Sequence, residues 1–138
     1  MWCIASMLHT ATTTVVDSGT LIAAMTEAST ITFDSDGLIP AVVQDARSGE
    51  VLLLAWMNRE ALDRTLESGS VTFWSRSRGE LWVKGATSGN TLTLVSVQIN
   101  CEGNSLLVLA HPAGPTCHTG NISCFYRELD PPVHLAGI

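Results

Sequence analysis

Short apolar segments separated by turn residues fill the chain between residues 38 and 112, and they constrain the fold more than any other feature. The first two flank a Ser48-Gly49 turn and the next two flank Arg78-Gly79, so each pair is expected to form an antiparallel hairpin. The fifth segment, TLTLVSVQIN, alternates as a half-buried strand does. The six expected strands are residues 38–45, 51–57, 71–76, 80–85, 91–100 and 105–112.

One segment has the pattern of a helix instead, NREALDRTLESG at residues 58–69. Asn58 is a good N-cap, Glu60 falls in the first turn, and Gly69 can end the helix. The expected inner face consists of Ala61, Leu62, Thr65 and Leu66. One short helix among several strands predicts a small α+β domain dominated by antiparallel sheet.

The first 24 residues differ from the rest, with one charge and no clear periodicity. They lack the positive start and continuous apolar stretch of a secretory signal, and no arginine precedes Arg47 as a transit peptide would require. We therefore expect residues 1–24 to be a poorly ordered extension in which Cys3 has no role. Residues 25–138 are expected to form one domain, since the chain of 138 residues leaves little room for two.

The charge balance excludes several classes of partner. Seven basic and 13 acidic residues give a net charge of −6 and an isoelectric point near 5.0, which argues against binding to nucleic acid or anionic membranes. No apolar run approaches the roughly 18 residues that span a bilayer. We expect a cytoplasmic protein, and the low charged fraction of 14% indicates a buried subunit interface.

Three cysteines and a histidine are the strongest sign of chemistry. Cys117, His118 and Cys124 lie in the loop-like stretch GPTCHTGNISCF, and Cys101 lies upstream. Without an export signal, a disulfide framework is not expected. Three thiolates with one open position are typical of a catalytic zinc site, although free cysteines also serve as small buried hydrophobes. The loop composition favours zinc, but spacing alone leaves both interpretations open.

A basic cluster precedes these cysteines, with Arg76, Arg78 and Lys84 within nine positions. The following KGATSGN supplies hydroxyl and amide donors, and its glycines let the backbone approach an anion closely. The expected phosphate-binding residues are Arg76, Arg78, Lys84, Thr87, Ser88 and Asn90. Trp74 and Trp82 could stack on a base or belong to the core. An ordinary solvated hairpin is the alternative for the charges.

Together these motifs resemble the phosphoribosyl-AMP cyclohydrolase family of histidine biosynthesis. GPTCHTGNISCF, NCEGNSLLVL and SRSRGELWVKGATSGN carry the resemblance, which runs from Asp36 to Phe125 and includes DGLIPAVVQD, SGEVLLLAWMN and EALDRTLESG. It implies an interlocked α+β homodimer that hydrolytically opens the adenine ring of 1-(5-phosphoribosyl)-AMP at the N1–C6 bond. It also implies a zinc ion shared between subunits, with Cys101 from one chain and Cys117 and Cys124 from the other.

The resemblance also assigns His118, either as the group that moves protons or as a loop histidine that orients the cysteines. His111 and His134 have no such context and are expected at the surface. The family's magnesium-binding aspartates are replaced by Asn100, Glu102 and Asn104, so zinc is expected to be kept. Magnesium is expected to bind weakly, not at all, or only with the substrate phosphates. This departure leaves two alternatives open, an enzyme for another N-substituted purine nucleotide and a noncatalytic dimer held by zinc.

Overall fold

The computed structural model describes residues 30–129, and the chain divides into the units Met1–Thr30 and Ile31–Ile138. The second unit contains every element discussed below, whereas the expected extension (1–24), Cys3 and His134 lie outside the described residues. The elements, in chain order, are β1 (Ile39–Asp45), β2 (Val51–Met57), α2 (Arg59–Ser68), β3 (Thr72–Ser75), β4 (Glu80–Val83), β5 (Leu92–Ile99) and β6 (Leu106–Pro112). All six strands and the helix fall where the sequence predicts them.

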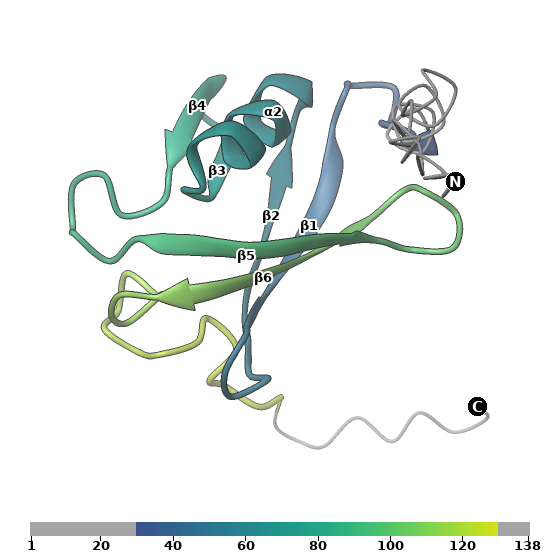
Figure 1. Cartoon of the computed structure of the whole chain (residues 1–138). Helices are drawn as coiled ribbons and strands as arrows, with labels where there is room; N and C mark the ends of the chain where they lie inside the picture. The colour runs from purple at the N-terminus through teal and green to yellow at the C-terminus, as the bar shows by residue number, and fades with distance from the viewer. Residues whose placement is uncertain (1–29, 130–138) are drawn as a thin grey trace, which may run out of the picture. The chain divides into compact units, whose positions relative to one another are not determined.

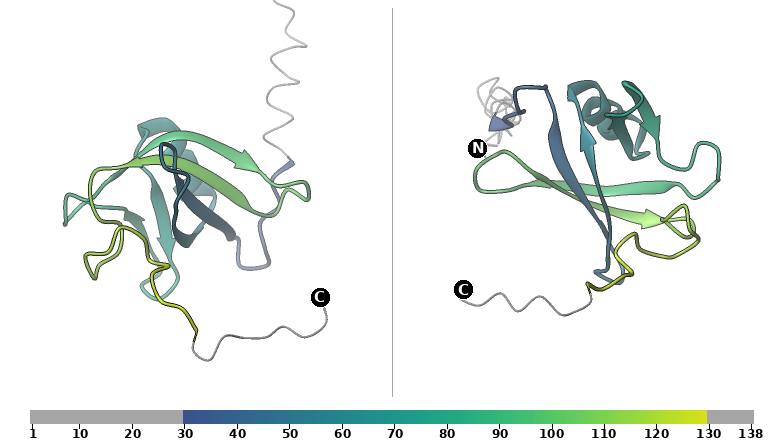
Figure 2. Two further views of the ribbon diagram at one scale, coloured as in Figure 1. Left: turned by 90° about the horizontal axis from the view of Figure 1, so that it is seen from below. Right: turned by 180° about the vertical axis from the view of Figure 1, so that it is seen from behind.

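The strands form a four-stranded sheet with the order β2-β1-β6-β5 and a separate β3–β4 hairpin (Figures 1 and 2). The β1–β2, β3–β4 and β5–β6 pairs are antiparallel, which confirms the expected α+β class. β1 and β6 pair in parallel, from Ala41 opposite Leu106 to Asp45 opposite Ala110, and the sequence did not indicate this. Both strands bury alternate side chains and carry few charges, so the interior of the sheet is their most favourable place.

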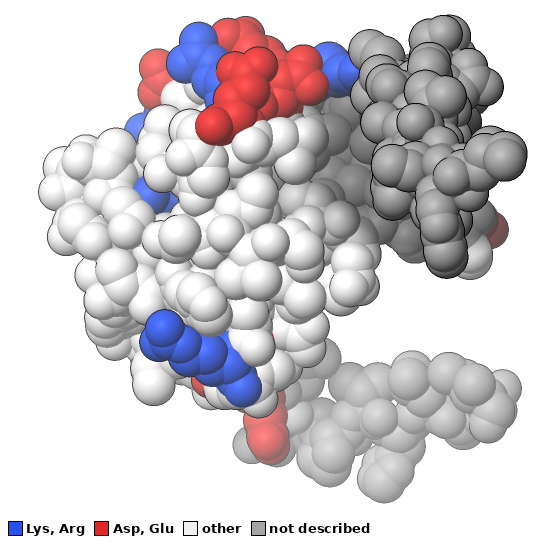
Figure 3. Space-filling view, viewed as in Figure 1, with Lys and Arg blue, Asp and Glu red and all other residues white. Residues whose placement is uncertain are grey.

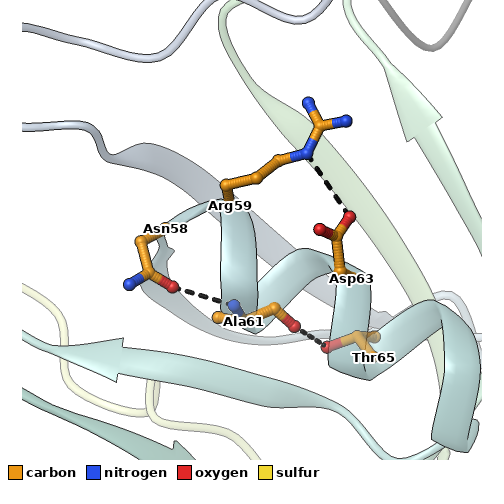
Figure 4. Close-up of polar contacts among 5 residues, drawn as sticks. All are labelled: Asn58, Arg59, Ala61, Asp63 and Thr65. Atoms are coloured by element: carbon orange, nitrogen blue, oxygen red, sulfur yellow. Dashed lines mark hydrogen bonds and ion pairs between the residues drawn. The ribbon is translucent and has the colours of Figure 1, made fainter.

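Helix α2 has the predicted ends, and Figure 4 shows the Asn58 cap at its N-terminal end. The Asn58 side chain accepts a hydrogen bond of 2.8 Å from the Ala61 N–H, and Gly69 ends the helix in a left-handed conformation. Thr65 Oγ1 donates to the Ala61 carbonyl and accepts from the first N–H of β3 at 2.9 Å. This buried hydroxyl therefore ties the helix to the β3–β4 hairpin.

Two sequence-based expectations about burial are wrong. Leu66 is 55% exposed, because at about 100° per residue it lies about 90° from the centre of the face formed by Ala61, Leu62 and Thr65. His111 is half-buried because β6 lies between β1 and β5, and its Nδ1 has no hydrogen-bond partner in the described part of the chain.

The core lies where α2 and the β3–β4 hairpin pack against the larger sheet. Its largest fully buried side chain is Phe73 of β3, which contacts the Trp82 ring with 5.6 Å between centroids. The remaining buried apolar residues of this cluster are Ile39, Ala41, Val43, Leu52, Leu53, Met57, Ala61, Leu62, Val71, Leu92, Leu106, Val108 and Ala110. In the described part of the chain, no helix has the length and apolar character needed to cross a bilayer.

Candidate active site

Two loops meet at one end of the β5–β6 pair. Residues 84–91 lead into β5 and residues 113–125 follow β6, and Leu92 pairs with Pro112 where the two loops begin. The Ala113 N–H donates to the Thr91 carbonyl at 2.9 Å, which fixes one loop to the other. Figures 1 and 2 show both loops at the end opposite the turn that joins β5 to β6. We call residues 84–91 the glycine loop and residues 113–125 the thiol loop.

Backbone hydrogen bonds shape the thiol loop and hold it against β2. The Cys117 N–H donates to the Asn121 carbonyl at 3.1 Å, which folds the segment back on itself. The Cys124 N–H donates to the Leu52 carbonyl at 2.8 Å. The Ser123 hydroxyl donates to the Val51 carbonyl, also in β2, at 2.7 Å. Cys117 and Cys124 are thereby brought close enough that each affects the ionisation of the other.

The pKa values of the two thiols are shifted in opposite directions. Thr119 Oγ1 donates to Cys117 Sγ at 3.0 Å, and this hydrogen bond is the main cause that lowers the pKa of Cys117, with a smaller contribution from the Lys84 charge. Burial is the main cause that raises the pKa of Cys124, and the neighbouring Cys117 adds to it. Cys117 is therefore the better thiolate, and the pair could hold a soft metal ion from this side.

The third predicted thiol is not beside this pair. Cys101 is exposed in the turn between β5 and β6, just after Ile99 pairs with Leu106. Seven residue steps along β5 separate that turn from the thiol loop, a distance of roughly 24 Å at about 3.4 Å per step. Accordingly, residues 30–129 contain no group of three His, Cys, Asp or Glu side chains that could hold a metal. Of the three predicted thiols, the structure brings together Cys117 and Cys124 but not Cys101.

A pocket of about 550 Å³ lies between the glycine loop and the thiol loop. It contains most of the residues that the sequence singles out, and none of its lining residues is a carboxylate. Lining residues predicted from the sequence are Arg78, Trp82, Lys84, Thr87, Ser88, Asn90, Cys117 and His118. Its size suits a nucleotide, and its donors suit an anion.

A second hollow of about 360 Å³ continues the first toward β2 and reaches Cys124. The residues that line both hollows are Arg78, Trp82, Lys84, Thr116 and His118. The sequence analysis missed Thr116, although it directly precedes Cys117. Thr116 is buried, and its hydroxyl has no hydrogen-bond partner among residues 30–129.

Lys84 is the most informative charge in the pocket. It is only 9% exposed, its ammonium lies 5.4 Å from the centre of the Trp82 ring, and no residue among 30–129 forms an ion pair with it. A buried cation without a counter-ion is costly, so an anion in the pocket would relieve that cost. Trp82 itself is 39% exposed, and its ring contacts the core on one side and lines both hollows.

The two predicted arginines differ in position. Arg78 lines both hollows and makes an exposed ion pair of 3.8 Å with Glu80. The Arg76 guanidinium lies over the Trp56 ring at 4.6 Å and does not line either hollow. The structure therefore brings Arg78, but not Arg76, to the pocket.

The β5–β6 turn forms a hydrogen-bonded amide network at the positions expected for magnesium. Asn100 Oδ1 accepts from the N–H groups of Asn104 and Ser105, at 2.9 and 3.0 Å. Asn104 Oδ1 accepts from Asn100 Nδ2 at 2.7 Å, and Asn104 Nδ2 donates to Glu102 Oε2 at 3.1 Å. These oxygens already have donors and two of the three side chains carry no charge, so the turn does not fit a hard divalent cation.

Several known proteins resemble this chain in sequence. The family model of phosphoribosyl-AMP cyclohydrolase matches residues 53–126. A phosphoribosyl-AMP cyclohydrolase of Cereibacter sphaeroides is 55% identical over 101 residues, which cover 73% of this chain and 85% of that protein. One of Rhizorhabdus wittichii is 57% identical over 98 residues, covering 71% and 79%. The histidine biosynthesis bifunctional protein HisIE of Deinococcus radiodurans is 56% identical over 105 residues, or 76% of this chain, and the match spans 48% of that longer protein.

Proposed function

This chain belongs to the phosphoribosyl-AMP cyclohydrolase family, and we propose that it opens the adenine ring of 1-(5-phosphoribosyl)-AMP by hydrolysis in histidine biosynthesis. The observation that carries the proposal is the pocket in which a carboxylate-free set of donors adjoins the Cys117–Cys124 pair. The larger hollow, which Cys117 lines, can hold the phosphates, and the second can hold the base beside Cys124. Substitution at N1 makes C6 electrophilic, so water adds at C6, the N1–C6 bond breaks, and N1 takes up a proton.

We further propose that Cys117 and Cys124 hold a zinc ion together with Cys101 of a second copy of the chain. The lowered pKa of Cys117 supports this, since thiolate is the form that binds the metal. When bound, zinc would lower the pKa of a water molecule and so supply a nucleophile at neutral pH. His118 is exposed at the junction of both hollows, where its imidazole can accept the proton of the attacking water and return it to N1.

A homodimer follows from the same proposal, because Cys101 lies at the far end of β5 from the other two thiols. The surface of β5, which leads to the turn that carries Cys101, supports a homodimer. β5 is the last strand of the sheet and has no charged residue. Its first residues bridge to residues 69–71, and beyond them it exposes Val95 by 49% and Ile99 by 41%. Figure 3 shows a largely uncharged surface over β5 and β6, with a cluster of acidic and basic side chains over α2 and a separate basic group at the lower end of the molecule. An uncharged edge with exposed apolar side chains is suited to a subunit interface.

We propose no dedicated magnesium site in the free protein, because the Asn100 and Asn104 oxygens accept hydrogen bonds within the turn. A divalent cation would instead arrive with the phosphates of the substrate.

The test is ring opening of 1-(5-phosphoribosyl)-AMP by the purified full chain loaded with zinc, with and without added magnesium. Turnover is expected in both conditions. His118→Asn should keep the zinc content and the dimer while lowering kcat about 100-fold or more, since general acid–base groups contribute roughly 10²- to 10⁴-fold. Absence of turnover by a zinc-loaded dimer would refute the assignment and leave a noncatalytic dimer or another N-substituted purine nucleotide as the alternatives.

A further inference from the structure

Gly114 faces the side chain of Asn90 across the two loops that form the pocket. A Cβ atom placed on Gly114 would lie 2.5 Å from Asn90 Oδ1 and 3.3 Å from Asn90 Cγ. Gly114 is not among the glycines with positive φ, so its backbone conformation is open to any residue. An alanine at position 114 would therefore overlap the Asn90 carboxamide and turn it away from this position.

In this contact the amide oxygen of Asn90 is the side-chain atom nearest to Gly114. Oδ1 is the atom turned toward Gly114, whereas Nδ2 is not among the atoms within 4 Å of the Cβ position. Asn90 lines the larger hollow, and its side chain makes no hydrogen bond to any residue of the described chain. The two N–H donors of Nδ2 are thus available to a ligand in the pocket.

We propose that Gly114 is a positioning residue that holds the Asn90 carboxamide with Nδ2 directed at an anionic oxygen of the bound ligand. The acceptor is a phosphate oxygen, because Asn90 shares the pocket with Lys84, Thr87 and Ser88 and no lining residue is a carboxylate. This rests on the proposed function for the identity of the substrate, but the contact can be tested without turnover.

The test is a double-mutant cycle of Gly114→Ala and Asn90→Ala in the full-length protein. Gly114→Ala should lower the urea midpoint of the unmodified protein, because the methyl group displaces the carboxamide. In the Asn90→Ala background the same substitution should have little effect, since the overlapping atoms are gone. An equal loss of stability in both backgrounds would overturn the contact.

Binding of AMP and of inorganic phosphate, measured by calorimetry, tests the function of the contact. Each single variant should weaken both ligands about 10- to 100-fold, as expected for a lost hydrogen bond to a charged group. The double variant should lose no more than Asn90→Ala alone. Asn90→Asp should weaken both further, because a carboxylate repels phosphate. If AMP weakens while phosphate does not, or if neither changes, the proposed acceptor is wrong.

Gly37→Ala is the matched control. Gly37 has a φ of +73°, no atom lies within 4 Å of its Cβ position, and it lines neither hollow. It should lower stability through backbone strain and leave AMP and phosphate affinity unchanged. The unmodified protein could fail to open the ring while the double-mutant cycle and the losses of AMP and phosphate affinity come out as expected. That result would refute the proposed reaction and support the role of Gly114. Failure of AMP binding in the unmodified protein would overturn the role itself.

Discussion

Gly85 begins the glycine loop, and its replacement by alanine should disrupt the pocket from one side. Its φ is +81°, and a Cβ atom there would lie 2.4 Å from Asn90 C and from Thr91 N. Both contacts are with backbone, so no side-chain rotation can relieve them. For the Cβ atom to lie even 3.0 Å from these atoms, the backbone at residue 85 and the backbone at residues 90–91 must separate by about 0.6 Å, the difference between 3.0 and 2.4 Å.

The magnitude follows from two contributions. The left-handed conformation costs alanine about 1–2 kcal/mol. Separation of the segments strains the hydrogen bond of 2.9 Å from the Gly89 N–H to the Gly85 carbonyl, and one lost bond of this kind costs about 1 kcal/mol. Gly85→Ala should therefore lower the free energy of unfolding by about 2–3 kcal/mol.

Gly89→Ala separates the two causes. Gly89 has a φ of +78° in the same loop, but no atom lies within 4 Å of its Cβ position, so only the conformational cost of about 1–2 kcal/mol applies. Urea unfolding of both variants at one protein concentration gives the comparison, and AMP affinity should fall at least tenfold more in Gly85→Ala. Equal effects of the two substitutions, within about 0.5 kcal/mol, would refute the argument that backbone overlap requires Gly85.

Three further predictions concern the metal ligands and the helix. Cys117→Ser and Cys101→Ser should each lower zinc affinity at least tenfold and weaken the dimer, so metal analysis with sedimentation should show both losses, and an unchanged zinc content would contradict the shared site. Asn100→Asp combined with Asn104→Asp should raise magnesium affinity at least tenfold in a calorimetric titration, and no gain would mean that these positions do not line a cation site. Thr65→Val should lower the free energy of unfolding by about 1–3 kcal/mol, because the first N–H of β3 loses its buried acceptor, and a urea midpoint equal to that of the unmodified protein would disprove that role.

The elements could be predicted because their signals are local. Asn58 and Gly69 mark both ends of α2 within the sequence of the helix itself, and Ser48-Gly49 marks the turn between β1 and β2. The parallel pairing of β1 with β6 has no such signal, since Leu106 lies 65 positions after Ala41 and apolar strands of this kind can pair in several orders.

The candidate site also contains residues that a local sequence signal reveals and residues that only the tertiary structure places. Lys84, Thr87, Ser88 and Asn90 were predicted because one loop carries them, and the pocket forms around that loop. Arg76 was grouped with them by sequence distance, but the side chain lies over Trp56 of β2, a neighbour that only the tertiary arrangement defines. The role of Gly114 could not be predicted either, because its constraint is the position of a side chain 24 residues away.

The position of Cys101 has a consequence for how the proposed activity depends on concentration. Because the turn that carries it lies roughly 24 Å from the thiol loop of the same chain, no local movement of a loop could complete a three-thiol site within one subunit. Zinc binding and association of two chains would then be one linked equilibrium, in which the metal favours the dimer and the dimer favours the metal. Dilution would reduce activity and zinc content together, whereas Gly85 and Gly114 would act on ligand affinity within each subunit.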